Sequence, residues 1–534
     1  MQLLGRDQIA RLMGMLGADR TEFSFGEDNG GSETDEAEPE CDVDQMLDFC
    51  NEVAKRLPSA FTSCFTTIFS LVSGNDNPAQ LVKMCSLLTA TGQLFSSAPL
   101  AKLRGLVRRL GPFCASGEAG LARSATSAIA ALGSTQLAAD GTPLHPDVTE
   151  LIDGYIEDLA QSLTSGLSDP EASAPPRKSP PKTSKSPKGS SKKKQAANAA
   201  ADPVAGRLDA LSVIARSHPA AFEPHIDDIQ TFVVREVLGI RNSKRASEQS
   251  SAAQQFSARA KVAGLHVLSA QLLGLTECAE SHAAAATVWK LLTKVIRKNG
   301  DISASADADE STCNDIVVAA ADCILEILSV QRPNYEKTVD REEALSALSL
   351  VAQNPDSQVR RRLCASLFSA ISSNKPQFVG YYTLFAILGD FVQDKDTQAL
   401  AKSRLKWVVQ TRRGMLSRSR MSGSDKSAHM PEMGLPYLVH LLAHSPDIED
   451  EYKNQYKGVI RVFELYFTFG HAARALDSTY GNYMLNVLHH IQRAATDATC
   501  DDDTGILQSI AEAGSHVLRA KMAVSDYTRK FQSN

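Results

Sequence analysis

The chain has 534 residues, 43% of them apolar, and a formal net charge of -6 at pH 7. It is long enough to bury a large core and is not basic throughout, so any contact with nucleic acid has to come from local patches. Ten scattered cysteines show no CxxC pair and no zinc-ligand spacing, which indicates buried thiols in a reducing compartment. The N-terminus lacks the apolar run of a signal peptide, and the most apolar stretch, 316–330, contains Asp322 and Glu326 and is too short for a bilayer. We expect a soluble intracellular protein without a membrane partner.

The N-terminal segment, 1–44, starts with a short amphipathic pattern and continues into an acidic tract, GEDNGGSETDEAEPECDVD at 26–44. This tract has almost no apolar content and cannot offset the entropy lost on ordering, so we expect it to be disordered. From residue 45 to 165 the pattern changes to helices with apolar side chains at i, i+3, i+4 and i+7. Two of them, 103–114 and 119–132, are separated by a few residues around Gly117, which predicts an antiparallel hairpin.

A basic segment at 166–204 interrupts the helical pattern and is rich in Pro, Ser and Lys, which predicts a disordered linker. Its cations are Arg177, Lys178, Lys182, Lys185, Lys188, Lys192, Lys193 and Lys194. Three interpretations stay open: a nuclear-localisation signal, a weak sequence-independent contact with DNA phosphates, and a solvated spacer. Ser179 and Ser186 each precede a proline and are candidate phosphorylation sites, where a phosphate would cancel nearly two charges.

The third segment, 205–534, resumes the helical pattern and forms the predicted main domain. Its predicted helices are 205–217, 223–238, 256–275, 282–298, 315–330, 341–353, 357–372, 378–393, 396–415, 436–443, 450–470, 476–494 and 503–524. Strand-type alternation appears nowhere at useful length, so the predicted fold class is all-α.

One hairpin in this segment identifies the type of repeat. The helix at 342–353 is broken by Asn354-Pro355-Asp356, and a second helix follows with Val359 and Arg360 near its start. An Asp in the turn caps the free N–H groups of the second helix, Val enters the core, and Arg lies outside, which is the pattern of HEAT repeats. We therefore predict a HEAT-repeat-like α-solenoid of antiparallel helical hairpins, interrupted by the disordered acidic and Lys/Pro/Ser-rich segments.

A second basic run is predicted to lie on a helix, the one that begins at Asp396. Lys402, Lys406, Arg413 and Arg420 share a narrow arc beside the packed face. A solvated face is the simple interpretation; the functional one is contact with an acidic partner segment or an inositol polyphosphate. Arg360 and Arg361 offer a weaker case of the same kind, and at least one arginine of 360–362 is expected to be structural.

Two histidines four residues apart, His440 and His444, raise the question of a metal site. HxxxH can hold zinc, but HLLAH lacks the Glu of HExxH and a third ligand. The two histidines fall opposite the apolar arc of Leu435, Leu438, Val439, Leu441 and Leu442. We predict packing rather than metal binding. Phosphate-binding and nucleophile motifs are also absent from the sequence, so we expect no cofactor, no metal and no enzymatic activity.

The C-terminal third carries a specific resemblance. The stretches NPDSQVRRRLCASLFSAI, YYTLFAILGDFVQDKDTQALAKSRLKWVVQTRRGML and MPEMGLPYLVHLLAHSPD occur in an order and spacing that resemble the precocious-dissociation-of-sisters (Pds) family of cohesin-associated proteins. The stretches LSVIARSHPAAFEPHIDDIQTFVVREVL and GEAGLARSATSAIAAL look like earlier repeats of the same family.

This resemblance implies a long HEAT solenoid in the nucleus, associated with chromatin. It implies binding to the kleisin subunit of cohesin, cooperation with a wings-apart-like release factor and with the cohesin acetyltransferase, and a part in both maintenance and release of sister chromatid cohesion. Family members usually run to about twice this length, and the N-terminal half of their solenoid has no counterpart here.

Two alternatives of different kinds remain open from the residues. The first is another HEAT-repeat adaptor, such as a karyopherin or a phosphatase scaffold. The second is a metal-dependent hydrolase that uses His440 and His444.

Overall fold

The computed structural model describes residues 43–95, 98–134, 145–168, 202–239, 256–274, 279–301, 310–329, 340–372, 378–390, 394–423, 426, 429–446, 456–469, 478–493 and 504–532. These residues form helices and turns, with no strand among them. The predicted all-α class is confirmed. The acidic tract up to residue 42 and the basic segment from 169 to 201, with Ser179 and Ser186, lie outside the described residues, whereas Asp44 already belongs to a helix.

The contacts divide the chain into two compact units, Met1–Leu275 and Thr276–Asn534. Helices on both sides of the basic segment therefore belong to unit 1. The predicted limits at 165 and 205 mark where the helical sequence pattern stops and resumes. The division between the two units is a different boundary, which falls after Leu275.

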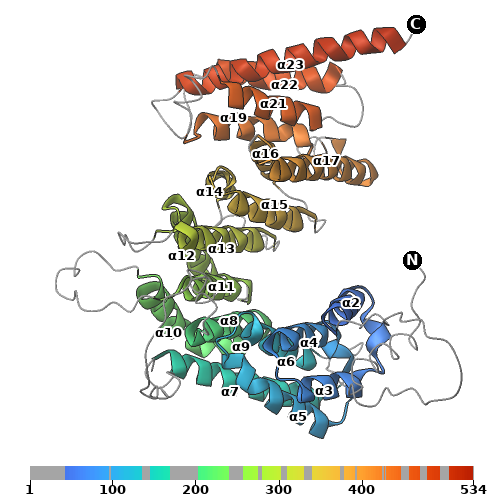
Figure 1. Ribbon diagram of the computed structural model, residues 1–534. Helices are drawn as coiled ribbons and strands as arrows, with labels where there is room; N and C mark the ends of the chain where they lie inside the picture. Colours follow the sequence, from blue (N-terminus) through green and yellow to red (C-terminus); the bar gives the residue numbers. More distant parts are fainter. Residues whose placement is uncertain are drawn as a thin grey trace, which may run out of the picture. The chain divides into compact units, whose positions relative to one another are not determined.

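Unit 1 is a stack of helices in two layers. In chain order its elements are α2 (Val43–Arg56), η1 (Pro58–Phe61), α3 (Phe65–Gly74), α4 (Pro78–Thr91), η2 (Gly92–Phe95), α5 (Leu100–Leu110), η3 (Gly111–Ala115), α6 (Leu121–Gly133), α7 (Pro146–Ser168), α8 (Pro203–Ser217), α9 (Pro219–Phe222), η7 (Glu223–His225), α10 (Ile226–Thr231), η8 (Phe232–Val237) and α11 (Ala258–Gly274). Helices α2, α4, α6, α8 and α11 pack in this order as one layer, and α3, α5 and α7 pack against it (Figure 1).

The local sequence explains these helices. Leu81, Met84, Cys85 and Leu88 of α4 are at most 2% exposed, and their spacing follows one helical face. At the start of α8, the Asp202 carboxylate accepts a hydrogen bond from Ala205 N at 3.0 Å, and Pro203 occupies the first turn. The seven cysteines among the described residues are buried thiols. Burial raises the pKa of the Cys85 thiol to about 12, so this thiol is inert.

Proline shortens two of the predicted helices in unit 1. The predicted helix 103–114 ends as an α-helix at Leu110, and Pro112 lies in the following 3-10 turn η3. The predicted helix 223–238 is also divided: Pro224 lies in a 3-10 turn, α10 covers only Ile226–Thr231, and Phe232–Val237 is a π-helix in which Leu238 N donates to Val233 O at 2.9 Å. Proline has no N–H to donate and clashes with the preceding turn, so an α-helix cannot run through it undisturbed.

Unit 2 begins with three hairpins, α12 (Ala279–Arg297) with α13 (Glu310–Ser329), α14 (Arg341–Ala352) with α15 (Ser357–Ser372), and α16 (Tyr381–Leu388) with α17 (Lys395–Arg418). The first helices of the hairpins, α12, α14 and α16, contact each other in sequence, as do the second helices, α13, α15 and α17. The stack continues through η11 (Pro431–Gly434), α19 (Leu435–Ala443), α21 (Lys457–Phe469), α22 (Ser478–Gln492) and α23 (Thr504–Gln532) (Figure 1).

The repeat chemistry predicted for 342–363 is present in unit 2. The Asp356 carboxylate accepts a hydrogen bond from Gln358 N at 2.8 Å at the start of α15, and Val359 is 2% exposed. Each unit is thus a HEAT-like stack of antiparallel hairpins. Among the described helices, none is both long enough and apolar enough to cross a membrane.

Candidate functional site

Arg360, in the first turn of α15, is only 4% exposed. Its guanidinium donates to the carbonyls of Asn354 at 2.7 Å and Pro355 at 2.8 Å, and it forms an ion pair with Asp394 at 3.0 Å. The Asp394 carboxylate also accepts from Thr397 N at 3.1 Å and so caps α17. The outward position predicted for Arg360 is wrong, because its side chain folds back and joins one hairpin to the next.

Asparagine side chains extend this link toward the preceding hairpin. Asn354 donates from Nδ2 to Asn314 Oδ1 at 3.3 Å, and Asn314 donates from Nδ2 to Asp356 Oδ2 at 3.1 Å. Asn314 and Asn354 are each at most 8% exposed, so both amides depend on these partners. A buried polar ladder therefore runs from α13 through the α14–α15 turn to α17.

Exposed ion pairs lie beside the ladder. Arg361 pairs with Asp396 at 2.9 Å, and Arg362 pairs with Asp315 at 2.7 Å. The Arg361 side chain is 45% exposed and its partner 84% exposed, so this pair is weak and can be exchanged for an outside carboxylate. Arg361 stays a predicted partner contact.

Helix α17 and the residues after it carry a strong excess of positive charge. From residue 402 to residue 421 every charged residue is a cation: Lys402, Arg404, Lys406, Arg412, Arg413, Arg418 and Arg420. Arg413 pairs with Glu432, which is 2% exposed, so that charge is neutralised within unit 2. Arg412 is buried. We call the remaining five, Lys402, Arg404, Lys406, Arg418 and Arg420, the α17 basic run.

The predicted stripe of Lys402, Lys406, Arg413 and Arg420 is therefore corrected at two positions. Arg413 reaches into the protein toward Glu432. Arg420 lies beyond the helix, because α17 ends at Arg418 and the backbone of Ser419 is extended, with φ -72° and ψ 151°. Lys402 and Lys406 keep their predicted place on the accessible side of α17, half-buried and exposed respectively.

An exposed tryptophan follows Lys406 in the sequence of the α17 basic run. Trp407 is 41% exposed, and its ring meets Phe368 of α15 at 5.0 Å between centroids and 67° between planes. The Arg404 guanidinium covers the same Phe368 ring at 3.7 Å. A shallow, open groove lies beside Trp407 and is lined by Ile371, Tyr382, Val408, Thr411, Arg412 and Met415. Charge patterning alone did not select Trp407; the available signal was an aromatic residue within a run of cations.

The two histidines of α19 follow the predicted helical phase. His440 and His444 are half-buried with ring centroids 4.4 Å apart, while Leu435, Leu438 and Val439 are completely buried. Among the described residues, no three His, Cys, Asp or Glu side chains are grouped so that they could hold a metal ion. Within the described part of the chain, the pair therefore has no third protein ligand of the kind that a zinc site requires.

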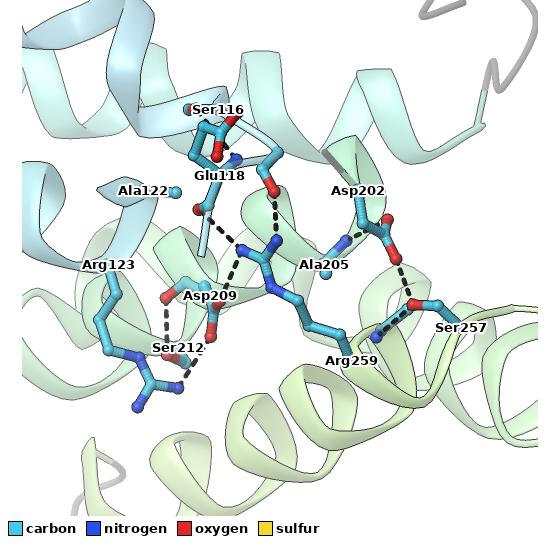
Figure 2. A network of polar contacts seen from close by, with 12 residues as sticks. Ser116, Glu118, Ala122, Arg123, Asp202, Ala205, Asp209, Ser212, Ser257 and Arg259 are labelled. Carbon is cyan, nitrogen blue, oxygen red and sulfur yellow. Dashed lines mark hydrogen bonds and ion pairs between the residues drawn. The ribbon is translucent and has the colours of Figure 1, made fainter. Parts of the chain in front are cut away.

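A polar cluster joins three helices in unit 1 (Figure 2). Arg259 of α11 donates to the carbonyls of Gly117 and Glu118, the latter at 2.8 Å, and lies 3.8 Å from the Asp209 carboxylate of α8. Arg123 of α6 pairs with Asp209 at 2.9 Å. Burial raises the pKa of the Asp209 carboxyl, although both arginines act in the opposite direction. This cluster locks consecutive hairpins together, as the Arg360 ladder does in unit 2.

Stacked antiparallel hairpins with polar links between neighbours define an α-solenoid protein of the HEAT type, whose accessible features are ridges and grooves. Residues 2–530 match the family model of the "Sister chromatid cohesion protein PDS5 protein". The chain belongs to this family, and the resemblance inferred from its residues is confirmed.

Relatives with known names agree with this assignment. The chain is 26% identical over 226 residues to "Sister chromatid cohesion protein PDS5 homolog A" of Gallus gallus and to the protein of the same name in Homo sapiens. Each match covers 41% of this chain and 16% of the relative. A solved structure of the Pds5-Scc1 complex aligns over 92% of this chain and 75% of that chain, with a TM-score of 0.30 and 11% identity.

Proposed function

We propose that this protein is a cohesin-associated scaffold that regulates the maintenance and release of sister chromatid cohesion by binding other proteins. The observation that carries this proposal is the family match, which extends over residues 2–530. By the same relationship, the proposed partners are the kleisin subunit of cohesin, a wings-apart-like release factor and the cohesin acetyltransferase. The proposed location is the nucleus, on chromatin.

The structure supports a binding mechanism for such a scaffold. Helical stacks present long surfaces to extended partners, which lose conformational entropy as they dock. The α17 basic run is the part of unit 2 best suited to an acidic ligand, because the region from 402 to 421 contains no Asp or Glu. Lys402, Lys406, Arg420 and Arg361 are the proposed contacts, and an inositol polyphosphate is a second candidate ligand for them.

Affinity purification of the tagged chain from nuclear extract, followed by mass spectrometry, tests the proposal. We expect the kleisin and the other cohesin subunits among the specific partners. Recovery of importin cargo or phosphatase subunits without any cohesin subunit would overturn it in favour of another HEAT adaptor. Metal analysis of the purified chain addresses the hydrolase alternative, which requires about one zinc per chain.

A further inference from the structure

The groove beside Trp407 combines an apolar lining with an exposed aromatic ring. The chain has two tryptophans: Trp289 is 2% exposed, as a core residue should be, whereas Trp407 is 41% exposed. Ile371, Val408 and Met415 line the groove next to Trp407. Large aromatic rings beside a hollow are the usual anchors of protein interfaces, since a bulky side chain of the partner can be desolvated there.

The orientation of Trp407 is fixed by its neighbours. Phe368 of α15 contacts the Trp407 ring edge to face. Arg404, one turn before Trp407 on α17, lies over the Phe368 ring at 3.7 Å. A ring held in this way loses little conformational freedom on binding, which favours affinity.

A buried cation lines the same groove. Arg412 is 6% exposed, and its Nε donates to the His429 carbonyl at 3.3 Å. Among the described residues, no carboxylate lies within ion-pair distance of Arg412, in contrast to Arg360 and Arg413. A charge in a poorly hydrated position is stabilised by an opposite charge, so a carboxylate entering the groove would gain a charge-assisted hydrogen bond.

We propose that this groove binds an acidic segment of a partner protein, in which a bulky apolar residue is flanked by Asp or Glu. The apolar residue packs on Trp407 between Ile371 and Met415. One carboxylate meets Arg412, and a flanking carboxylate meets Arg418, which is exposed and follows Met415 by three residues on the same side of α17. The inference builds on the proposed scaffold function and assigns the chemistry of one contact.

The groove favours a peptide over a single-stranded nucleic acid. Proteins that bind single strands stack successive bases on several aromatic rings along a basic channel. Here one exposed ring is surrounded by aliphatic side chains and Tyr382, whose own ring is buried at 2% exposure. This lining matches a single anchoring side chain.

Peptide titration of the purified full chain tests the inference. The probes are fluorescein-labelled decapeptides with one central Phe among Glu residues, the same peptide with Ala in place of Phe, and the same peptide with Lys in place of Glu. We expect the first to bind, and to change the fluorescence of Trp407. Both control peptides should bind at least about tenfold more weakly, since each lacks one of the two recognition elements.

Variants locate the binding. Trp407→Ala should weaken binding of the first peptide at least about tenfold, and Arg418→Ala should weaken it several-fold and reduce its salt dependence. Lys290→Ala is the matched control, because Lys290 is exposed on α12 of the same unit. The affinity of this variant for the first peptide should stay unchanged. Circular dichroism checks that each variant is folded. If Trp407→Ala does not fold, Trp407→Phe, which keeps an aromatic ring, replaces it in the binding assay.

Three results would overturn the inference: equal binding of the Phe and Ala peptides, unchanged affinity in both Trp407 variants, or tighter binding of a ten-nucleotide oligothymidine that Trp407→Ala abolishes. The last would assign the groove to nucleic acid. Because the probes are synthetic, the outcome is independent of whether the chain co-purifies with cohesin, and failure of one proposal can be told from failure of the other.

Discussion

The guanidinium of Arg360 lies 3.0 Å from the carboxylate of Asp394, and this pair joins the second helix of one hairpin to the capped start of α17. The two side chains are 5% and 11% exposed. The neighbouring pair, Arg361 with Asp396, has nearly the same length, 2.9 Å, but is open to solvent. The two arginines are adjacent in sequence and differ in burial, which makes them a matched pair for experiment.

Arg360→Ala should lower the free energy of unfolding of unit 2 by about 3 kcal/mol or more, because it leaves two carbonyls and a buried carboxylate without their donor. Arg361→Ala should lower it by less than about 1 kcal/mol, since an exposed ion pair contributes little. Urea denaturation followed by the fluorescence of Trp289 and Trp407, both in unit 2, measures the difference. Equal losses in the two variants would contradict the assignment of Arg360 as the structural link.

Gly206 lies where α8 approaches the turn before α6. A Cβ at this position would collide with the Ser116 carbonyl oxygen, which is backbone and cannot move aside easily. Gly206→Ala should therefore destabilise unit 1 by about 2 kcal/mol or more. Gly154, in the middle of α7, has nothing within 4 Å, and Gly154→Ala should stabilise by about 0.5 to 1 kcal/mol through the lower entropy of the unfolded chain. Thermal unfolding of both variants checks the opposite signs.

His266 on α11 should make unit 1 sensitive to acid. Burial, assisted by the nearby charge of Arg123, lowers the pKa of His266 from 6.5 to about 4. The unfolded chain therefore binds a proton between these values and the folded chain does not, so stability falls as the pH drops from about 6.5 toward 4. At pH 5 the loss should be about 2 kcal/mol relative to pH 7.5.

The measurement for His266 is a comparison with His266→Gln, which cannot take up the proton. Urea unfolding of both proteins by circular dichroism at pH 7.5 and pH 5 gives the double difference. A pH dependence that is the same in both proteins would show that His266 does not cause it.

The basic segment predicts a change of location. Replacing residues 177–194 with a Gly/Ser sequence of equal length removes Arg177, Lys178 and the six lysines that follow while it keeps the spacer. If the segment directs import, the protein should move to the cytoplasm, as seen by fluorescence microscopy of a tagged chain. Unchanged nuclear accumulation together with loss of salt-sensitive DNA binding would favour the DNA contact, and no change in either would leave only the spacer.

Helical periodicity predicted much of the fold, because apolar spacing directly reports which face of a helix is buried. The capping by Asp356 and the burial of Val359 followed from the same local chemistry. Local pattern did not show that α10 begins only after Pro224 or that α16 is limited to Tyr381–Leu388. A turn at Gly389 and Asp390 follows α16. The apolar residues Phe391 and Val392, which led to the longer predicted helix 378–393, come after this turn in the sequence.

The candidate site was harder to predict than the fold. Arg360 and Arg413 have the residue type and spacing of exposed cations, but their partners, Asp394 and Glu432, lie 34 and 19 residues further along the chain. Only the packing of hairpins brings these groups together. The same holds for Trp407, whose contact with Phe368 and whose groove require α15, α16 and α17 to be in place.

The order of packing in unit 1 has a consequence for how such a protein evolves. Helices α2, α4, α6, α8 and α11 pack chiefly against the helices before and after them in this layer. The fit of each helix therefore depends mainly on two neighbours. A substitution that disturbs the packing of one helix can be compensated by a substitution in an adjacent helix, without changes in the other helices of the layer. Sequences of this architecture can therefore diverge one helix at a time while the packing order is kept. The identity of 26% over 226 residues with the Gallus gallus relative is consistent with such divergence.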